Sequence, residues 1–277
     1  MILIGDAGGT TTNWRAIADG KIHQLKTRGL NLAHDRATQY MEEVSEDLLP
    51  YQEAGEVHFY VSGLTNDPAD RQAVVAAFSV FFKNADILVE NDVLAAARGL
   101  CGHQPGWAGI LGTGANLTYF DGDKLIRKIP SLGYVLGDEG SAAFMGKRLL
   151  TDFLRGEMPS AFADTFARRF QLDEKAILMQ SYQSDSPKSF FASFSQFIHQ
   201  HIRNPYCYRL VYESFQTHFD VFYKNPVAGD SVHYTGSVAF YFSNILRQVA
   251  SDRQILIGHI TESPLAGLTL YHQKTEK

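Results

Sequence analysis

The apolar and polar positions of the first hundred residues alternate between two periods. Short branched or aliphatic runs, and stretches that alternate large with small residues, predict strands at Met1–Ile4, Asn13–Ala18, Lys21–Thr27, Glu56–Val61 and Ile87–Val89, the last one buried. Apolar residues at helical spacing predict helices over Asp35–Leu49, from Asp67 to Phe82 and over Val93–Leu100. A three-strand meander followed by alternating helices and strands indicates a mixed sheet with helices packed on it.

The same outline recurs after residue 107. Strands are predicted at Trp107–Leu111, Asn116–Tyr119 and Lys124–Ile129, followed by a helix over Ser141–Phe153. Further along, strands are predicted at Val232–Tyr234 and Gln254–Ile257, and a closing helix at Pro264–Gln273. Each half opens with a hairpin rich in glycine and threonine, which suggests an ancient duplication.

The stretch from about 155 to 225 is rich in Phe and Tyr. Its apolar residues fit two helical faces, Phe190 to Ile202 and Val211 to Phe222. Such aromatic residues could form a stacking platform for nucleobases. The helical spacing favours the other interpretation, a helical insertion whose aromatic residues form a core, and so does the fact that the region is not basic overall.

Composition narrows the classes of protein. The chain has 277 residues, a formal net charge of −5 and a pI near 6.0, which argues against nucleic acid or an anionic membrane as a partner. We find no apolar run of about 18 residues and no secretory pattern at the start of the sequence, so the expected location is the cytoplasm. The two cysteines, Cys101 and Cys207, form no CxxC motif, so no zinc or iron–sulfur site is predicted.

Three turns could bind a nucleotide. The first follows Asp6, and because strands flank it on both sides it is neither a Walker loop nor a Rossmann turn. Its backbone N–H groups and hydroxyls could hold phosphate, and Asp6 could hold Mg²⁺ through water, although an ordinary tight turn would look the same. A second glycine turn follows Leu111, and a third lies at a predicted strand-to-helix junction. The residues expected to bind ATP are Gly8, Gly9, Thr10, Thr11 and Thr12, then Gly112, Thr113 and Gly114, and then Gly236, Ser237 and Val238.

Carboxylates mark two further positions. Asp92 stands where a predicted strand ends and a helix begins, the edge of an α/β sheet at which ligands usually bind. Asp92 could act as a general base or could simply cap the helix. The turn Gly137–Ser141 puts Asp138 and Glu139 just before another helix, where they could hold sugar hydroxyls or a metal.

Four motifs, GDAGGTTT, END with GTGAN, GYVLGDEGSA, and TGSVA, stand in this order. The chain resembles the sugar kinase, heat-shock-protein and actin superfamily, and within it the N-acetylglucosamine kinase family with its BadF/BadG/BcrA/BcrD-type ATPase relatives. The resemblance implies an α/β fold of two ribonuclease H-like (actin-like ATPase) domains, each with a mixed sheet, and ATP in the interdomain cleft. One domain is expected at 1–101, joined by a C-terminal helix at about 264–277. The other is expected at 102–263, with a helical insertion at about 155–225.

The resemblance also implies roles for single residues. It places the sugar-activating base at Asp92 and implies ATP and Mg²⁺ as cofactors. Two departures stand out: Thr11 occupies a position that is usually Lys or Arg, and Ala7 one that is usually Gly or Ser. The zinc-binding cysteines of the neighbouring ROK kinases are absent. The positions expected to contact the sugar are Asn31, Ser62, Gly63, Asp92, Thr113, Asn116 and Asp138.

These expectations together predict an ATP-dependent amino-sugar kinase, with N-acetylglucosamine as the expected substrate and its 6-phosphate as the product. A homodimer is expected, as is usual in the family. Two alternatives stay open, a regulatory ATPase and a non-catalytic sugar-binding sensor. The wide spacing of Cys101 and Cys207 disfavours the ATPases that bind an iron–sulfur cluster, whereas Thr11 keeps the sensor open.

Overall fold

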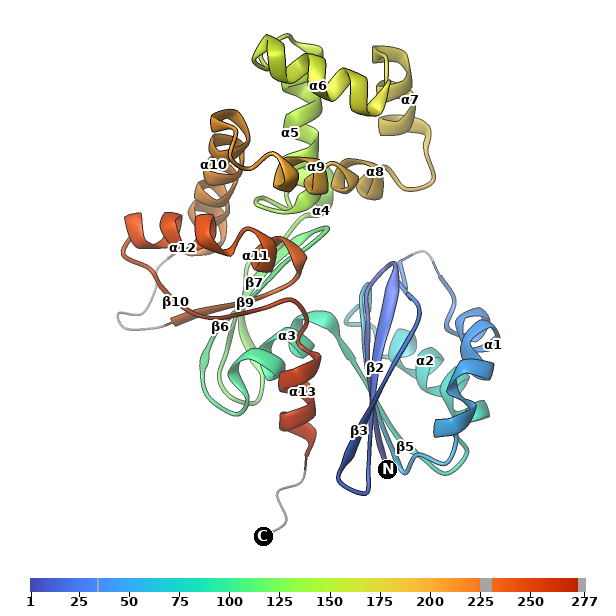
Figure 1. The fold of residues 1–277 in the computed structure, drawn as a ribbon. Coiled ribbons are helices and arrows are strands. Elements are labelled where there is room, and N and C mark those ends of the chain that lie inside the picture. The colour runs from blue at the N-terminus through green and yellow to red at the C-terminus, as the bar shows by residue number, and fades with distance from the viewer. Residues whose placement is uncertain (34, 225–230, 274–277) are drawn as a thin grey trace. The chain divides into compact units, whose positions relative to one another are not determined.

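The structure is a computed structural model that describes residues 1–33, 35–224 and 231–273. It divides into two compact units (Figure 1): unit 1 comprises Met1–Pro105, Asp121–Leu125 and Ser263–Lys277, and unit 2 comprises Gly106–Phe120 and Ile126–Glu262. Each unit contains one five-stranded sheet. The expected end of the helical insertion at residue 225 and the segment 274–277 lie outside the described residues.

The sheet of unit 1 combines an antiparallel meander with parallel strands. Its order is β3-β2-β1-β4-β5, with β1 antiparallel to β2, β2 antiparallel to β3, and β1, β4 and β5 parallel. The predicted meander and mixed sheet are therefore confirmed. The strands are β1 (Ile2–Ala7), β2 (Thr11–Ala18), β3 (Lys21–Arg28), β4 (Glu56–Val61) and β5 (Asp86–Asn91).

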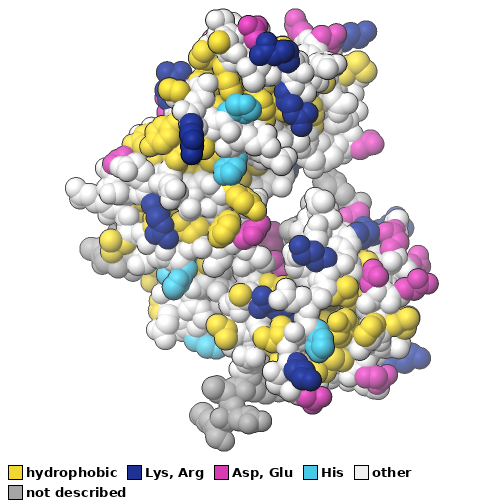
Figure 2. All heavy atoms as spheres, viewed as in Figure 1, with side chains coloured by type: hydrophobic (Ala, Val, Ile, Leu, Met, Phe, Trp, Pro, Cys, Tyr) yellow, Lys and Arg dark blue, Asp and Glu magenta, His cyan; other side chains and the backbone are white. Residues whose placement is uncertain are grey.

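Helices cover both faces of this sheet, because neighbouring side chains on a strand point to opposite faces. Leu3 and Phe59 belong to the core under α1 (Ala37–Leu48) and α2 (Pro68–Phe81). Their neighbours Ile4 and Tyr60 belong to a smaller cluster under α3 (Asp92–Cys101) and α13 (Leu265–His272). The outer side of α1 is acidic, and Figure 2 shows Asp and Glu side chains gathered there.

The predicted start of α2, with Asp67 as the N-cap, is confirmed. Asp67 is the N-cap and its carboxylate accepts the backbone N–H of Ala69 at 2.9 Å, while Pro68 takes the first helical position. Proline suits that position because its missing N–H would have no intrahelical partner there.

Unit 2 repeats the topology of unit 1. Read from its meander, its strand order is β8-β7-β6-β9-β10, the same arrangement as β3-β2-β1-β4-β5. Strand β6 is antiparallel to β7 and parallel to β9, and β9 is parallel to β10. The equal strand order, and the equal directions of the pairs β6–β7, β6–β9 and β9–β10, support the duplication inferred from the two hairpins. The strands are β6 (Gly106–Leu111), β7 (Ala115–Phe120), β8 (Leu125–Lys128), β9 (Ser231–Thr235) and β10 (Leu256–Thr261).

The aromatic stretch folds as a helical layer with most of its Phe rings inside. Its Phe residues pack in one buried core together with Trp107 and Leu117 of the sheet, so the core-packing interpretation is confirmed. The expected single helical face from Phe190 to Ile202 is wrong, because two short helices, α8 (Pro187–Ser193) and α9 (Ser195–Gln200), meet at Phe194. The other helices of this layer are α6 (Ser160–Phe170), α7 (Glu174–Gln183) and α10 (Pro205–Phe222).

Two predicted strands need correction. Ile87–Val89 is a strand but not a buried one, because β5 is an edge strand and Leu88 is 36% exposed. The last strand begins at Leu256 rather than Gln254, because Gln254 has a φ of 58° and belongs to the turn after α12 (Ser243–Asp252). A left-handed φ is incompatible with a strand.

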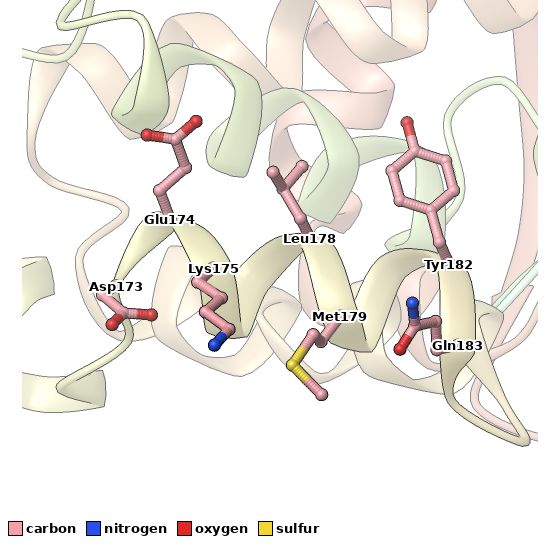
Figure 3. Close-up of a pocket in the computed structure, with 7 residues that line it drawn as sticks. All are labelled: Asp173, Glu174, Lys175, Leu178, Met179, Tyr182 and Gln183. Atoms are coloured by element: carbon pink, nitrogen blue, oxygen red, sulfur yellow. The ribbon is translucent and has the colours of Figure 1, made fainter.

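The remaining helices of unit 2 frame the predicted turns. They are α4 (Gly133–Leu136), α5 (Ala142–Leu154) and α11 (Ser237–Tyr241). Among the described residues, no helix combines the length and the apolar character needed to span a bilayer. A shallow hollow lies beside α7, and all its lining side chains, including Leu178, Met179 and Tyr182, come from that helix and the residue before it (Figure 3). It therefore contains none of the predicted site residues.

Helix α13 can join unit 1 only because two glycines allow its backbone to touch α3. A Cβ at Gly267 would lie 1.7 Å from the Gly99 carbonyl oxygen, and a Cβ at Gly99 would lie 2.6 Å from the Pro264 carbonyl oxygen. We therefore expect Gly267→Ala to destabilise unit 1 by about 1–3 kcal/mol, the usual cost of overpacking. Urea unfolding measures this, with Leu270→Ala on the exposed side of α13 as the control. Equal stability of the two variants would contradict the close backbone contact.

Candidate active site

The first predicted phosphate turn lies between β1 and β2, and it is braced by the chain segment after β3. Gly8 donates its N–H to the Thr11 carbonyl at 3.1 Å, and Leu30 donates to the Gly8 carbonyl at 3.0 Å. Gly29 must be glycine, because a Cβ there would lie 2.3 Å from the Gly8 carbonyl oxygen. Gly9 and Thr10 at the tip are exposed. The tip is thus held in place while it stays open to a ligand.

Thr12 departs from the expected role. Its side chain is fully buried; its hydroxyl donates to the Arg28 carbonyl at 2.9 Å and accepts from the Tyr40 hydroxyl at 2.9 Å. Its hydroxyl is therefore engaged in the core rather than free for phosphate. Of the predicted phosphate-binding residues of unit 1, those from Gly8 to Thr11 remain at least partly exposed.

Two carboxylates of unit 1 lie close together at the ends of parallel strands. Asp92 accepts the Ser62 hydroxyl at 2.8 Å, and Asp6 is 3.5 Å from the Ser263 hydroxyl. The Asp6 side chain is half-buried, and its desolvation together with the neighbouring charge of Asp92 raises its pKa to about 7, against the lowering effect of Ser263. A desolvated carboxyl with a raised pKa lacks a compensating charge, and a bound cation would provide one.

The alternative role of Asp92 as a helix cap is wrong. Asn91 is the N-cap of α3, and its side chain accepts the backbone N–H of Leu94 at 2.8 Å. Asp92 is the first residue inside the helix. Its side chain is directed to Ser62 at the end of β4, so it takes part in the side-chain cluster at the sheet edge.

Asn31, Ser62 and Gly63 meet beside Asp92. Asn31 and Ser62 form an isolated parallel bridge, and Leu32 donates its N–H to the Ser62 carbonyl at 3.0 Å. Gly63 has a φ of 80°, and a Cβ there would lie 2.4 Å from Asn31 Oδ1. In unit 1, the structure therefore brings together the predicted sugar-contacting residues and the predicted base.

The second glycine turn is built into the start of α5 in unit 2. Ala142 donates its N–H to the Gly112 carbonyl at 2.9 Å, and Ala143 donates to the Thr113 carbonyl at 3.3 Å. Asp138 is almost fully buried, with a φ of 59°, and its Oδ1 accepts the Ala115 N–H at 3.2 Å. The predicted turn and the predicted sugar carboxylate are thus neighbours.

Asn116 has an unsatisfied acceptor next to this turn. Its Oδ1 is buried and finds no hydrogen-bond donor within the described part of the chain. Leaving a buried amide oxygen unpaired costs about 1–3 kcal/mol, so such atoms usually mark a place where a ligand or water binds.

The third turn packs against the second. Gly236 has a φ of 113°, and a Cβ there would lie 2.4 Å from the Leu111 carbonyl oxygen. Ser237 is exposed, whereas the side chain of Val238 is 2% exposed and belongs to the core of unit 2. Val238 can therefore offer a ligand only its backbone.

Three residues near these clusters were missed by the sequence analysis. Ser263 contacts Asp6, Lys188 lies 2.9 Å from Asp138 Oδ2, and His218 lies behind the acidic turn. Ser263 could have been suspected, because it precedes the closing helix. Lys188 and His218 stand in the aromatic stretch, where no motif distinguishes them.

His218 links the helical layer to the acidic turn. Its Nδ1 lies 3.0 Å from the Glu139 carbonyl oxygen and its Nε2 lies 3.0 Å from the Tyr234 hydroxyl. Since a carbonyl can only accept, Nδ1 carries the proton and Nε2 accepts from Tyr234. Complete burial lowers the pKa of His218 to about 4, so this residue is neutral in the folded protein.

The fold places the chain among solved structures of kinases. The "Putative N-acetylglucosamine Kinase" of Porphyromonas gingivalis matches with a TM-score of 0.92 and 35% identity, over 100% of both chains. The "Putative N-acetylglucosamine Kinase" of Chromobacterium violaceum matches with a TM-score of 0.73 and 19% identity over 98% of both chains. A "putative N-acetylmannosamine kinase" of Listeria monocytogenes matches with a TM-score of 0.54 and 14% identity, over 98% of this chain and 96% of that chain. At these two lower identities the likeness concerns the fold alone.

Two mixed sheets of equal strand order, flanked by helices, define the actin-like ATPase fold, and the chain is a sugar kinase of that fold class. More closely, it belongs to the N-acetylglucosamine kinase family together with the Porphyromonas gingivalis protein. No protein-family model and no curated protein matches the sequence.

The neutral His218 makes the stability of unit 2 sensitive to acid. Because its pKa is about 4 when folded and 6.5 in the reference state, the unfolded chain takes up a proton first as the pH falls. Stability is therefore lost as the pH falls from 6.5 towards 4, by about 2 kcal/mol between pH 7 and pH 5. We expect His218→Gln to lose about 2 kcal/mol less over this interval than the wild type does.

Urea unfolding at the two pH values, followed by the fluorescence of Trp107 in a Trp14→Phe background, measures the difference. Only the change between pH values is compared, so a uniform loss of stability in the variant does not matter. Exposed His23 in β3 provides the control variant His23→Gln. An unchanged pH dependence in His218→Gln would contradict the neutral, buried state of His218.

Proposed function

We propose that the chain transfers the γ-phosphoryl group of ATP to the 6-hydroxyl of N-acetylglucosamine, giving ADP and the 6-phosphate. The observation that carries this proposal is the Asp92 carboxylate, which Ser62 holds at 2.8 Å at the edge of the unit 1 sheet, next to the half-buried Asp6. The name of the Porphyromonas gingivalis relative supports the choice of sugar.

Asp92 is the proposed general base. Its carboxylate accepts the proton of the sugar hydroxyl while that oxygen forms a bond to the γ-phosphorus and the bond to the ADP oxygen breaks. Phosphoryl transfer depends mainly on positioning and on neutralising charge, so a carboxylate held by a fixed hydroxyl suits the task. Ser62 donates to Asp92 and thereby orients it.

Mg²⁺ is the proposed metal, and Asp6 is the residue that would hold it, through water. The half-buried Asp6 carboxyl, with its pKa raised to about 7, fits a cation that would offset the repulsion from Asp92. Among the described residues, no group of three or more His, Cys, Asp or Glu side chains gathers as a metal site. Mg²⁺ does not need such a group, because it keeps several waters and binds substrate phosphates. When bound, it would neutralise charge on the phosphates.

The backbone turns are the proposed nucleotide ligands. Gly9 and Thr10 offer exposed backbone at the first turn, and Gly112 to Gly114 form the second. Gly236 brings the backbone before Ser237 against the second turn, which suits the approach of a flat adenosine group. Binding of ATP in an interdomain cleft stays a prediction, as do the homodimer and the cytoplasmic location.

The proposed sugar ligands combine acceptors with groups that both donate and accept. Asp138 and the orphan Oδ1 of Asn116 accept hydrogen bonds from hydroxyls or an amide N–H. Thr113, Asn31 and Ser62 can do both, as an acetamide and a ring of hydroxyls require, and Gly63 shapes the loop around Asn31. A substrate matched in this way is a polyol rather than an apolar molecule.

A coupled assay of ADP release tests the proposal. ADP release should depend on a sugar and should be fast with N-acetylglucosamine. It should be far slower with glucose, because a site that hydrogen-bonds an acetamide rejects an analogue lacking it. Glucosamine, N-acetylmannosamine and N-acetylmuramic acid complete the panel, and NMR of the product identifies the phosphorylated oxygen. Sugar-independent ADP release would indicate a regulatory ATPase, and sugar binding without ADP release would indicate a sensor, the alternative that Thr11 keeps open.

The variant Asp92→Asn tests the role of Asp92 as general base. The amide keeps the shape of the side chain but cannot take a proton, so kcat should fall about 10²- to 10⁴-fold. The KM for the sugar should change little. Asp19→Asn, in an exposed turn of unit 1, is the matched control. A variant with a quarter of the wild-type turnover would remove Asp92 from the mechanism.

A further inference from the structure

We propose that Lys188, which lies in the helical insertion, is a positioning residue for the sugar site: it holds the Asp138 carboxylate in the orientation that accepts the sugar hydroxyls. This inference rests on the proposed function of Asp138. It gives the aromatic insertion a part in substrate binding that its sequence does not suggest.

The contact is direct and lies at the glycine turn. The Lys188 ammonium is 2.9 Å from Asp138 Oδ2, and the Lys188 side chain is 37% exposed whereas that of Asp138 is only 3% exposed. A Cβ at Gly114 would lie 2.6 Å from Lys188 Nζ and 3.0 Å from Asp138 Oδ2. Gly114 is therefore the residue that leaves room for the ion pair above the turn.

The arrangement fixes one carboxylate from two sides and leaves part of it free. Oδ1 accepts the Ala115 N–H, and Oδ2 pairs with Lys188. An ionised carboxylate has about four acceptor positions, so about two remain for a ligand. The backbone of Asp138 is in the left-handed region, which sets the direction of its side chain. Without Lys188, a nearly buried negative charge would lose its only cation among the described residues within ion-pair distance.

Lys188 can reach this carboxylate because the insertion is anchored next to it. The Cβ position of Gly146 in α5 lies 1.8 Å from the Phe191 carbonyl oxygen, so α5 and α8 touch through their backbones. Phe191 is also buried in the unit 2 core. The lysine thus projects from a rigid support, three residues before that contact, and its charge stands at a defined place.

The experiment compares Lys188→Met, Lys188→Arg and Asp138→Asn with the wild type, and includes the double variant Lys188→Met with Asp138→Asn. Lys175→Met, on the exposed side of α7, is the matched control. The measurements are the KM values for N-acetylglucosamine and for ATP, kcat, the melting temperature, and calorimetric titration with N-acetylglucosamine without ATP. The titration gives a reading that does not depend on turnover.

Lys188→Met should raise the KM and Kd for the sugar about 10- to 100-fold, the range found at metal sites when a residue that orients a metal-binding side chain is removed. The KM for ATP should stay within about two-fold, and Lys188→Arg should restore most of the sugar affinity. In the Asp138→Asn background, Lys188→Met should change sugar affinity by less than about two-fold, because the two residues act as one unit. If Lys188 served stability alone, Lys188→Met would lower the melting temperature without this selective loss of sugar affinity.

Three results would overturn the inference while leaving the proposed function intact. They are an unchanged sugar affinity in Lys188→Met, an equal loss in the wild-type and Asp138→Asn backgrounds, and a rise in the KM for ATP without one for the sugar. If Lys188→Met fails to fold, Lys188→Arg provides the test instead. A folded Lys188→Arg variant that does not keep most of the sugar affinity would also overturn the inference. A wild-type chain that neither binds the sugar nor releases ADP with it would overturn the proposed function first, and the inference with it.

Discussion

The parallel pairing of β1, β4 and β5 is the constraint on which the unit 1 cluster depends. Asp6 pairs in register with Tyr60, Ala7 with Val61, and Val61 with Asn91, so the three strands end at one level. The residues at or just after these ends, Asp6, Ser62 and Asp92, are thereby forced together although 86 positions separate the first from the last. The cost is a pair of partly desolvated like charges, and desolvation together with the charge of Asp92 raises the pKa of Asp6.

Much of this could be predicted from the sequence, because strand ends and glycine turns leave local signals. The hairpins, the mixed sheets and the α2 cap follow from patterns of a few residues each. The grouping of Asn31, Ser62 and Gly63 with Asp92 was implied by the family resemblance instead. The motifs also carried the resemblance that the structural comparison supports. Here a short pattern is enough, because the strand and the turn that follows it determine where the polar residue stands.

The errors have a different origin. The burial of Ile87–Val89 depends on whether the strand lies at an edge of the sheet, and Thr12 is engaged by Tyr40, a residue 28 positions away. Lys188 and His218 are invisible in the sequence for the same reason, since their partners Asp138 and Glu139 lie 50 and 79 positions away. Contacts between elements that are distant in the sequence determine the burial and the partners of these residues, and local spacing cannot predict such contacts.

In unit 1, the strand that carries Asp6 is synthesised before unit 2, whereas Ser263 and α13 are synthesised after it. Because domains generally fold as they leave the ribosome, the first hundred residues must remain without one covering helix while all of unit 2 is made. Ile4, Tyr60 and Ala95, which α13 covers through Leu265 and Leu268, stay open to solvent during that time. The cluster around Asp6 is therefore completed only when translation has passed Leu268, and a nascent chain that stops earlier presents an apolar surface to chaperones.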